Sequence, residues 1–182
     1  MSDSSRPLRG TDLKRFHRTV RRELGEHRRL AFVLENISFP VNVGSLVRIA
    51  DALDAQLELC GITPDPTQPT AARVGRGKHQ RVPWRRHADA ASAIQVLAEE
   101  GFLPVAVELT AGARPYHEVP WPAAVALVLG SEEHGLTRGA LAACDSAVYV
   151  PMLGRGRSLN VHVAAAVVAY RALLAPPSNP ST

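Results

Sequence analysis

Residues 147–164, AVYVPMLGRGRSLNVHVA, join a short apolar run to a long apolar one through a loop of glycine and arginine. The run 147–150 predicts a buried strand, and the run 159–174 predicts a helix. Ser158 lies where the helix begins, and a serine there is explained by N-capping alone. Asn160 in the first turn of an apolar helix has no such simple explanation, and it points to a ligand-binding loop.

The chain before this stretch shows the same alternation of strand and helix. We expect strands at 30–34, 57–62, 102–108 and 123–129, and helices at 43–53, 88–100 and 137–143, the last capped by Thr137. The stretch 63–83 is rich in Pro, Gly, Thr and Arg, so we expect a long mobile loop there. This alternation indicates an α/β fold with a mainly parallel sheet flanked by helices.

Two further strand ends carry glycine and polar residues, and ligands of parallel sheets bind beyond such ends. In the segment 36–48, NISFPVNVGSLVR, Asn42 can cap the helix and Gly44 permits close approach of another backbone. Arg48 lies on the polar side of that helix, where a surface arginine paired with a carboxylate is an equal alternative. The segment 129–136, LGSEEHGL, taken alone is an ordinary strand-to-helix turn.

Basic residues gather in two blocks. The net charge is +4, yet residues 1–30 hold nine Arg or Lys against four Asp or Glu and so carry +5. After a disordered leader, a helix from Thr11 or Asp12 to about His27 is expected, with an apolar stripe of Leu13, Phe16, Val20 and Leu24. The second block, within a stretch free of acidic residues from 66 to 88, comprises Arg73, Arg76, Lys78, Arg81, Arg85 and Arg86.

Two basic blocks on an otherwise neutral chain favour a polyanionic partner over merely solvated surface. Aromatic residues make up only 5%, so contacts to phosphates are more plausible than base stacking. The residues expected to contact this polyanion are Arg15, Arg18, Arg22, Arg76, Lys78 and Arg81.

Several other classes of protein are disfavoured. Cys60 and Cys144 cannot form a disulfide framework and are interpreted as small buried apolar residues, and the histidines lack metal-ligand spacing, so no metal is expected. No apolar run spans a bilayer and the N-terminus lacks the apolar core of a secretory signal, so we expect a cytoplasmic protein. The glycines at 75–78 and 154–156 do not form a phosphate-binding fingerprint.

The three strand-end segments, in this order, resemble the three motifs of the SPOUT superfamily, in its SpoU/TrmH branch of RNA ribose methyltransferases. The first, N-x-G-x-x-x-R, is Asn42, Gly44 and Arg48, and the second, G-x-E-x-x-G, is Gly130, Glu132 and Gly135. The third, P-M-x-G…S-L-N-V-x-V-A, comprises Pro151, Met152, Gly154, Ser158, Leu159, Asn160, Val161, Val163 and Ala164. The resemblance covers about 30–174, and the basic helix before it resembles the N-terminal arm of tRNA-modifying members.

The resemblance implies an α/β fold with a C-terminal trefoil knot, a homodimer whose active sites take residues from both subunits, and S-adenosylmethionine (AdoMet) as cofactor. The cofactor-binding residues it implies are Leu129, Gly130, Glu132, Val150, Met152, Ser158 and Leu159. The catalytic residues it implies are Arg48, Asn42, Glu132, Ser158 and Asn160. The domain organisation expected is a basic arm at 1–29, a knotted methyltransferase domain at 30–175 and a disordered tail at 176–182.

The activity implied is 2′-O-methylation of a ribose in structured RNA, with tRNA and a D-loop guanosine favoured. The alternatives are an rRNA methyltransferase and a non-catalytic RNA-binding protein with a vestigial AdoMet pocket. A nicotinamide-binding Rossmann protein is disfavoured because the glycine fingerprint after the first strand is missing. The sequence departs from the family pattern at His162, where a small residue is common, and in ending soon after Leu174 without a longer basic extension.

Overall fold

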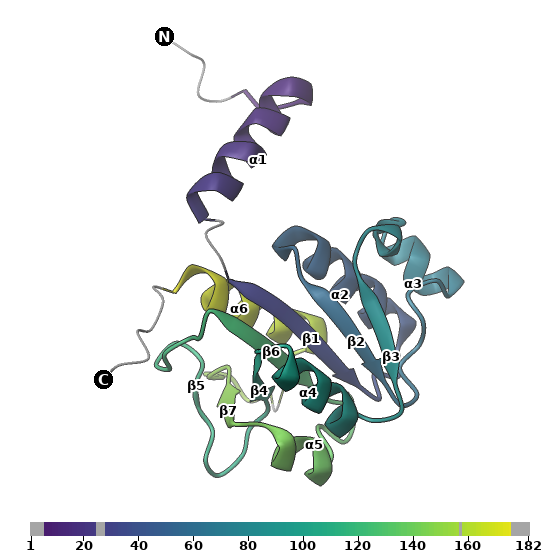
Figure 1. The fold of residues 1–182 in the computed structure, drawn as a ribbon, viewed down its shortest axis with the longest axis vertical. Helices are drawn as coiled ribbons and strands as arrows, with labels where there is room; N and C mark the ends of the chain where they lie inside the picture. Colours follow the sequence, from purple (N-terminus) through teal and green to yellow (C-terminus); the bar gives the residue numbers. More distant parts are fainter. Residues whose placement is uncertain (1–5, 25–27, 157, 176–182) are drawn as a thin grey trace.

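Seven parallel strands form a single sheet in the part of the chain that the structure, a computed structural model, describes: residues 6–24, 28–156 and 158–175. The strand order is β3-β2-β1-β6-β4-β7-β5 (Figure 1). The strands are β1 (Arg29–Glu35), β2 (Gln56–Cys60), β3 (Trp84–His87), β4 (Leu103–Val107), β5 (Arg114–Pro115), β6 (Ala124–Leu129) and β7 (Ser146–Tyr149). The expected α/β fold with a mainly parallel sheet is confirmed.

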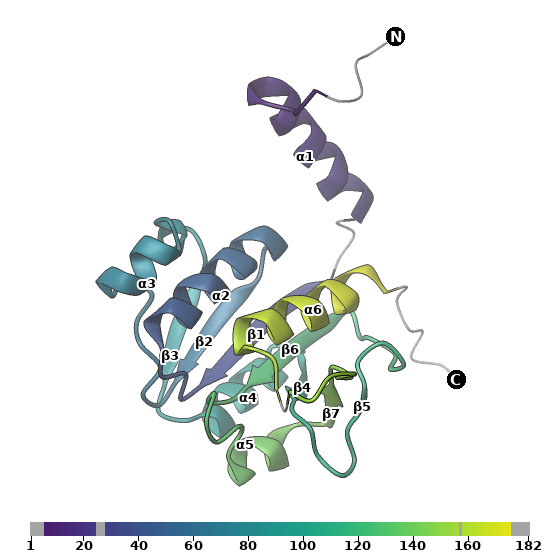
Figure 2. The same ribbon diagram turned by 180° about the vertical axis from the view of Figure 1, so that it is seen from behind.

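Helices cover both faces of the sheet. The helices α2 (Pro40–Leu53), α3 (Pro69–Val74) and α6 (Val161–Leu174) lie on one face, and α4 (Ala90–Glu99) and α5 (Arg138–Ala143) on the other (Figures 1 and 2). Side chains of β1 alternate between the two layers, as the pleat of a strand requires. Phe32 and Leu34 pack under α2 and α6, while Ala31 and Val33 face α4.

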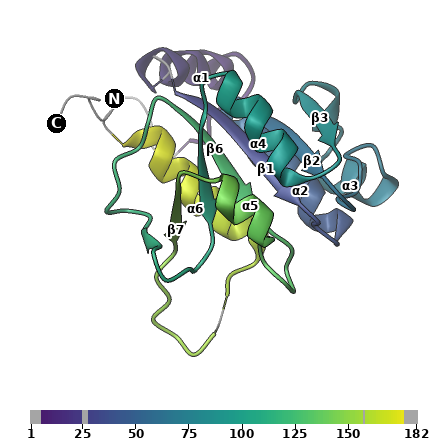
Figure 3. The same ribbon diagram turned by 60° about the horizontal axis from the view of Figure 1, so that its bottom comes forward.

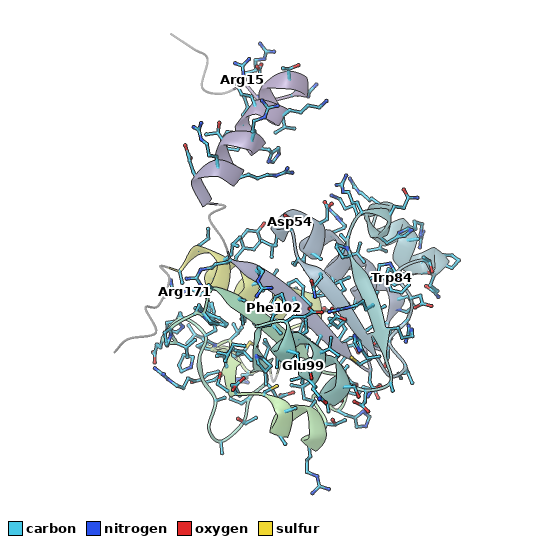
Figure 4. All side chains as sticks on the ribbon, viewed as in Figure 1. Arg15, Asp54, Trp84, Glu99, Phe102 and Arg171 are labelled. Atoms are coloured by element: carbon cyan, nitrogen blue, oxygen red, sulfur yellow. The ribbon has the colours of Figure 1, made fainter. Side chains whose placement is uncertain are left out.

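The basic N-terminal segment forms α1 (Gly10–Leu24), which stands apart from the sheet and its covering helices (Figures 1 and 2). The helix begins before Thr11 and Asp12, so the expected cap at those residues is wrong, and His27 lies outside the described residues. The side chains of Leu13 and Phe16 are 38% and 51% exposed. Arg15 lies on this helix, apart from the sheet (Figure 4).

The expectation of a long loop at 63–83 is wrong, because this stretch contains α3 and the 3-10 helix η1 (Lys78–Gln80). Gln68 caps α3 by accepting from the amide of Ala71, and a proline occupies the first turn, where its missing N–H costs nothing. Gly44 of α2 makes room for α3, since a Cβ there would strike the Ala71 carbonyl and the Val74 side chain. The predicted close backbone approach at Gly44 is therefore confirmed.

Most of the second basic block is paired with carboxylates of the chain. Asp51 on α2 binds both Lys78 and Arg81, and Asp65 binds Arg86. Arg85 donates to both oxygens of the fully buried Glu58 on β2, and the His87 ring lies 2.6 Å from one of them, Oε2. These pairs neutralise much of the positive charge that, from the sequence pattern, was expected to bind a polyanionic partner. The strand β3, which carries two of these side chains, was missed because it is only four residues long.

Both cysteines are held in the thiol form by their surroundings. Cys60 is buried, Cys144 is half-buried, and burial raises the pKa of each thiol to about 12. The interpretation of Cys60 as a buried apolar residue is confirmed, and Cys144 packs at the edge of the core. Within the described ranges, none of the helices has the length and apolar character needed to span a bilayer.

Candidate active site

The carboxyl ends of β1, β4, β6 and β7 meet at one edge of the sheet, which Figure 3 brings forward. A cavity of about 440 Å³ lies there. Its lining comes from all three segments singled out in the sequence and from the end of β4. The lining residues are Phe39, Asn42, Val107, Glu108, Leu109, Leu129, Gly130, Ser131, Glu132, Gly135, Tyr149, Val150, Met152, Ser158, Leu159, Asn160, Val161 and Ala164.

Asn42 enters this site from inside α2. The helix begins at Pro40, whose fixed φ suits the first helical position, and its N-cap is Phe39 with no side-chain hydrogen bond. The expected N-capping role of Asn42 is therefore wrong. Its side chain, 5% exposed, instead donates from Nδ2 to Oε1 of Glu132 at 2.5 Å. The amide thus belongs to the site and not to the helix terminus.

Glu132 joins two of the three segments. Besides the bond from Asn42, its Oε2 accepts from the backbone amide of Ser38 at 3.2 Å. The carboxylate therefore ties the loop after β6 to the loop after β1. This link spans more than 90 residues of sequence, and the parallel pairing of β1 with β6 makes it possible.

The loop after β6 is compact because glycine occupies its critical positions. A Cβ on Gly130 would lie on the backbone of Gly135 and Leu136, well inside contact distance. Gly135 has φ +67, and a Cβ there would strike the carboxylate of Glu108. That carboxylate accepts from the amides of Leu109 and Leu136 at 3.1 and 3.2 Å. The cavity wall is therefore built of backbone, which lets a ligand approach main-chain groups closely.

The third segment enters the site at the start of α6. The N-cap of this helix is Asn160, whose Oδ1 accepts from the amide of His162 at 3.1 Å. The expected N-cap at Ser158 is wrong, and Ser158 is an exposed residue that faces the cavity two positions earlier. The His162 ring reaches across to α2, where Nδ1 lies 3.0 Å from Oδ1 of Asn42. Burial lowers the pKa of this histidine, which favours the neutral ring.

Arg48 does not line the cavity. It is exposed on α2, six residues after Asn42, which separates the two by about 120° around the helix and about 9 Å along it. Among the described residues it has no ion-pair partner, so the alternative of a surface arginine held by a carboxylate is not met by any of them. The other four residues predicted as catalytic, and all seven predicted to bind the cofactor, line the cavity.

Sequence reasoning missed the contribution of β4. Glu108 follows this strand directly and lines the cavity, as do Val107 and Leu109. The rule used for the other strands, a polar residue just beyond a carboxyl end, would have identified it. Phe39 and Tyr149 also line the cavity, and neither carried a sequence signal because apolar residues near strand ends are common.

The cavity fits a ligand of AdoMet's size and mixed polarity. Its volume falls in the range of about 300–1,000 Å³ that is usual for small-molecule sites. Apolar side chains, among them Leu129, Val150 and Leu159, form much of the wall. Polar groups of Asn42, Glu132 and Ser158 supply a few fixed hydrogen-bonding positions. Such a wall can hold a flat base between apolar side chains and main-chain groups.

Comparisons with known proteins point to one family. The SpoU rRNA Methylase family matches residues 29–170. A tRNA (guanosine(18)-2′-O)-methyltransferase of Thermus thermophilus is 38% identical over 143 residues, which cover 79% of this chain and 73% of that enzyme. A 23S rRNA (guanosine(2553)-2′-O)-methyltransferase of Bacillus subtilis is 33% identical over 143 residues, covering 78% of this chain and 57% of that enzyme.

Solved structures show the same fold. An AdoMet-bound rRNA methyltransferase from Sinorhizobium meliloti superimposes with a TM-score of 0.75 at 28% identity, covering 81% of this chain and 56% of that one. The chain thus spans little more than half the length of that protein and of the Bacillus enzyme. The matched region nevertheless includes all three segments that line the cavity. The chain belongs to the SpoU/TrmH family of the SPOUT superfamily, the AdoMet-dependent RNA ribose 2′-O-methyltransferases.

Proposed function

We propose that this chain transfers the methyl group of AdoMet to the ribose 2′-oxygen of a guanosine in tRNA. The observation that carries the proposal is the convergence of Asn42, Glu132, Ser158 and Asn160, from three distant segments, on one cavity. The preference for tRNA rests on the 38% identity to an enzyme named for guanosine 18 of tRNA. The Bacillus relative, named for an rRNA nucleotide, makes rRNA the second candidate.

AdoMet would lie in the cavity, with its adenine against the backbone of the loops at 129–130 and 150–152 and against Leu159. When bound, it supplies an activated methyl group, so the protein's task is to place the ribose hydroxyl and manage its proton. Placement of a nucleophile about 3–3.5 Å from its target contributes on the order of 7–11 kcal/mol to such reactions. Asn42, Glu132 and Asn160 form the polar rim on which this placement would depend.

Arg48 would reach the reacting ribose from a second copy of the chain. It is exposed and free of ion-pair partners among the described residues, yet it lies away from the cavity of its own subunit. Arginine is a poor base because its pKa exceeds about 12. Its proposed role is therefore to orient the 2′-hydroxyl and to stabilise the negative charge that develops on the oxygen.

The surface around α2 and α6 supports a homodimer. The two helices pack against each other, and their outer sides expose Val41, Val163, Tyr170 and Leu174, which are 39–53% accessible, next to Phe39 at 55%. Exposed apolar side chains on two neighbouring helices favour an interaction site. A second copy packed on it would bring another α2, and therefore another Arg48, towards the cavity.

The strand connections support a C-terminal knot. The segment 108–123, between β4 and β6, extends past β7 and forms β5, which is the edge strand on that side of the sheet. The chain enters β7 from α5 on one face and leaves it for α6 on the other. A chain that changes faces between β4 and β5, next to the loop 108–123, has the connections that a trefoil knot would need.

RNA would contact the basic side chains of α1 and the neighbourhood of α3. Arg15, Arg18 and Arg22 are exposed on α1, and Arg76 is exposed beyond α3. Lys78 and Arg81 already share Asp51, so their contribution to phosphate binding would be smaller. Phosphate contacts of this type make binding strongly dependent on salt.

The test is methylation of separated tRNA and rRNA pools with methyl-labelled AdoMet, followed by nucleoside analysis. We expect label in 2′-O-methylguanosine from tRNA. Label on a base would contradict the proposed reaction, and label confined to rRNA would replace the proposed substrate. Calorimetry with AdoMet separates the remaining alternative, since a vestigial pocket in a non-catalytic RNA-binding protein would show no binding.

A further inference from the structure

His162 stands at the centre of a chain of hydrogen bonds that joins all three segments of the site. Its backbone amide donates to Oδ1 of Asn160, and its ring Nδ1 faces Oδ1 of Asn42. Asn42 in turn donates to Glu132, which also accepts from Ser38. His162 does not line the cavity, but two residues that do line it bind to it directly.

The hydrogen-bonding capacity of these partners determines which nitrogen of the neutral His162 ring carries the hydrogen. The carboxylate of Glu132 can only accept, so the side of the Asn42 amide that faces it must be the NH₂ group. The other side of that amide is then the carbonyl oxygen, which also can only accept. His162 must therefore carry its hydrogen on Nδ1 when the ring is neutral.

Without the histidine, nothing else on α6 is seen to hold the Asn42 oxygen. A side-chain amide can turn over, and it would then present oxygen to the Glu132 carboxylate and lose the bond that links them. The ring of His162 is partly buried between α2 and α6 and opposes that turn. After the turn its N–H would face the NH₂ group, and two donors cannot form a hydrogen bond. The histidine thus orients Asn42, and through it Glu132.

We infer that His162, as its Nδ1–H tautomer, is a positioning residue of the methyl transfer, aiming the Asn42 amide at Glu132. This inference rests on the proposed function for its catalytic consequence, but the tautomer and the bond to Asn42 are properties of the protein alone.

Two substitutions of similar size separate the two ring nitrogens. His162→Asn places an amide nitrogen near the position of Nδ1, whereas His162→Gln places one near Nε2. His162→Ala removes both ring nitrogens. The matched control is His117→Asn, at an exposed histidine on the segment after β5. AdoMet affinity by calorimetry and melting temperature report separately on binding and on folding.

We expect kcat to fall about tenfold in His162→Ala and His162→Gln, because the hydrogen bond that orients Asn42 is lost and one such bond corresponds to about a tenfold change in rate. His162→Asn should recover to within about threefold of the parent rate, and AdoMet affinity should change less than about twofold throughout. In an Asn42→Ala background, His162→Ala should have almost no additional effect. A rate unchanged in His162→Ala, or His162→Gln recovering as well as His162→Asn, would overturn the inference.

The tautomer can be measured whether or not the chain methylates RNA. Nitrogen-15 spectra of histidine-labelled protein distinguish Nδ1–H from Nε2–H rings, and the His162→Asn variant identifies the signal. We expect the Nδ1–H form in the parent protein and its loss in Asn42→Ala. An Nε2–H ring in the parent would overturn the inference even if the methyl transfer itself is confirmed. An Nδ1–H ring would support the assigned tautomer and its bond to Asn42 even if no RNA is methylated.

Discussion

The carboxylate of Glu35, buried at the end of β1, accepts two hydrogen bonds from Thr137, one from the backbone amide at 2.9 Å and one from the hydroxyl at 2.8 Å. Thr137 is itself the N-cap of α5 and accepts from the amide of Ala140. The strand that precedes the first segment of the site thus anchors the helix that follows the second segment. The loop 130–136 is held at its far end by this contact.

Replacing Glu35 with Ala should lower the free energy of unfolding by about 1–3 kcal/mol, because the two hydrogen bonds from Thr137 to the buried carboxylate would be lost. Urea denaturation measures the loss. The matched control is Glu118→Ala, at an exposed side chain whose nearest charged partner is His117, and it should change stability by less than about 0.5 kcal/mol. Equal effects of the two substitutions would mean that the buried contact contributes nothing.

Gly130→Ala should disrupt the cavity wall, because the new Cβ would lie on the backbone of Gly135 and Leu136. Overpacking of this kind costs about 1–3 kcal/mol, and we expect AdoMet affinity to fall at least tenfold in a calorimetric titration. Gly139→Ala is the control, since its Cβ would meet only the Thr137 hydroxyl at 3.9 Å. In the helix α5 that alanine should be neutral or stabilising by about 0.5–1 kcal/mol. Unchanged affinity in Gly130→Ala would show that this loop does not hold the cofactor.

Arg48→Ala should abolish methyl transfer and leave AdoMet affinity within about twofold, because Arg48 is outside the cavity of its own chain. If the arginine acts across a dimer, mixing Arg48→Ala with Gly130→Ala subunits should restore activity, since one of the two sites in a mixed dimer is then intact. Labelled methyl incorporation into RNA measures both effects. Near-normal turnover of Arg48→Ala alone would remove Arg48 from the mechanism, and failure of the mixture would place it in the same subunit.

The ion pairs of Asp51 should contribute to stability only above acidic pH. Hydrogen bonds from Arg81, and then from Lys78, lower the pKa of Asp51 to about 2. A depressed folded-state pKa means that the contribution is complete above the unfolded value of about 4 and is lost as the pH falls towards 2. The difference in unfolding free energy between the parent and Asp51→Asn should therefore shrink between pH 5 and pH 2. A difference that stays constant over this range would rule out the pair.

Most strands and helices could be predicted because a buried element requires a run or stripe of apolar residues that is visible in the local sequence. The strands β1 and β6 are unbroken apolar runs, and α5 carries its own capping threonine, so the expected types were confirmed. Short or edge elements leave no such trace: β3 has four residues, β5 has two, and α3 is stabilised by packing against Gly44. Neighbours in space, and not local composition, decide these pieces.

Both asparagines of the site show the same limit. The sequence marked Asn42 and Asn160 as important, but it assigned Asn42 to a helix cap and Ser158 to the cap that Asn160 provides. A proline at the first position of α2 moves the start of that helix three residues earlier and leaves the Asn42 amide inside its first turn. The pairing of β1 with β6 then gives that amide its partner Glu132, and the packing of α2 on α6 gives it His162.

The sequence by itself determined the alternation of strands and helices, the three polar segments at strand ends and the family to which they point, because each of these is written in neighbouring residues. Tertiary structure alone decided that the segments share one cavity, that Arg48 lies outside it, and that most of the second basic block is paired with carboxylates. The physical reason is distance along the chain. A parallel sheet brings together strand ends that are tens of residues apart, and no local pattern records which side chains then meet.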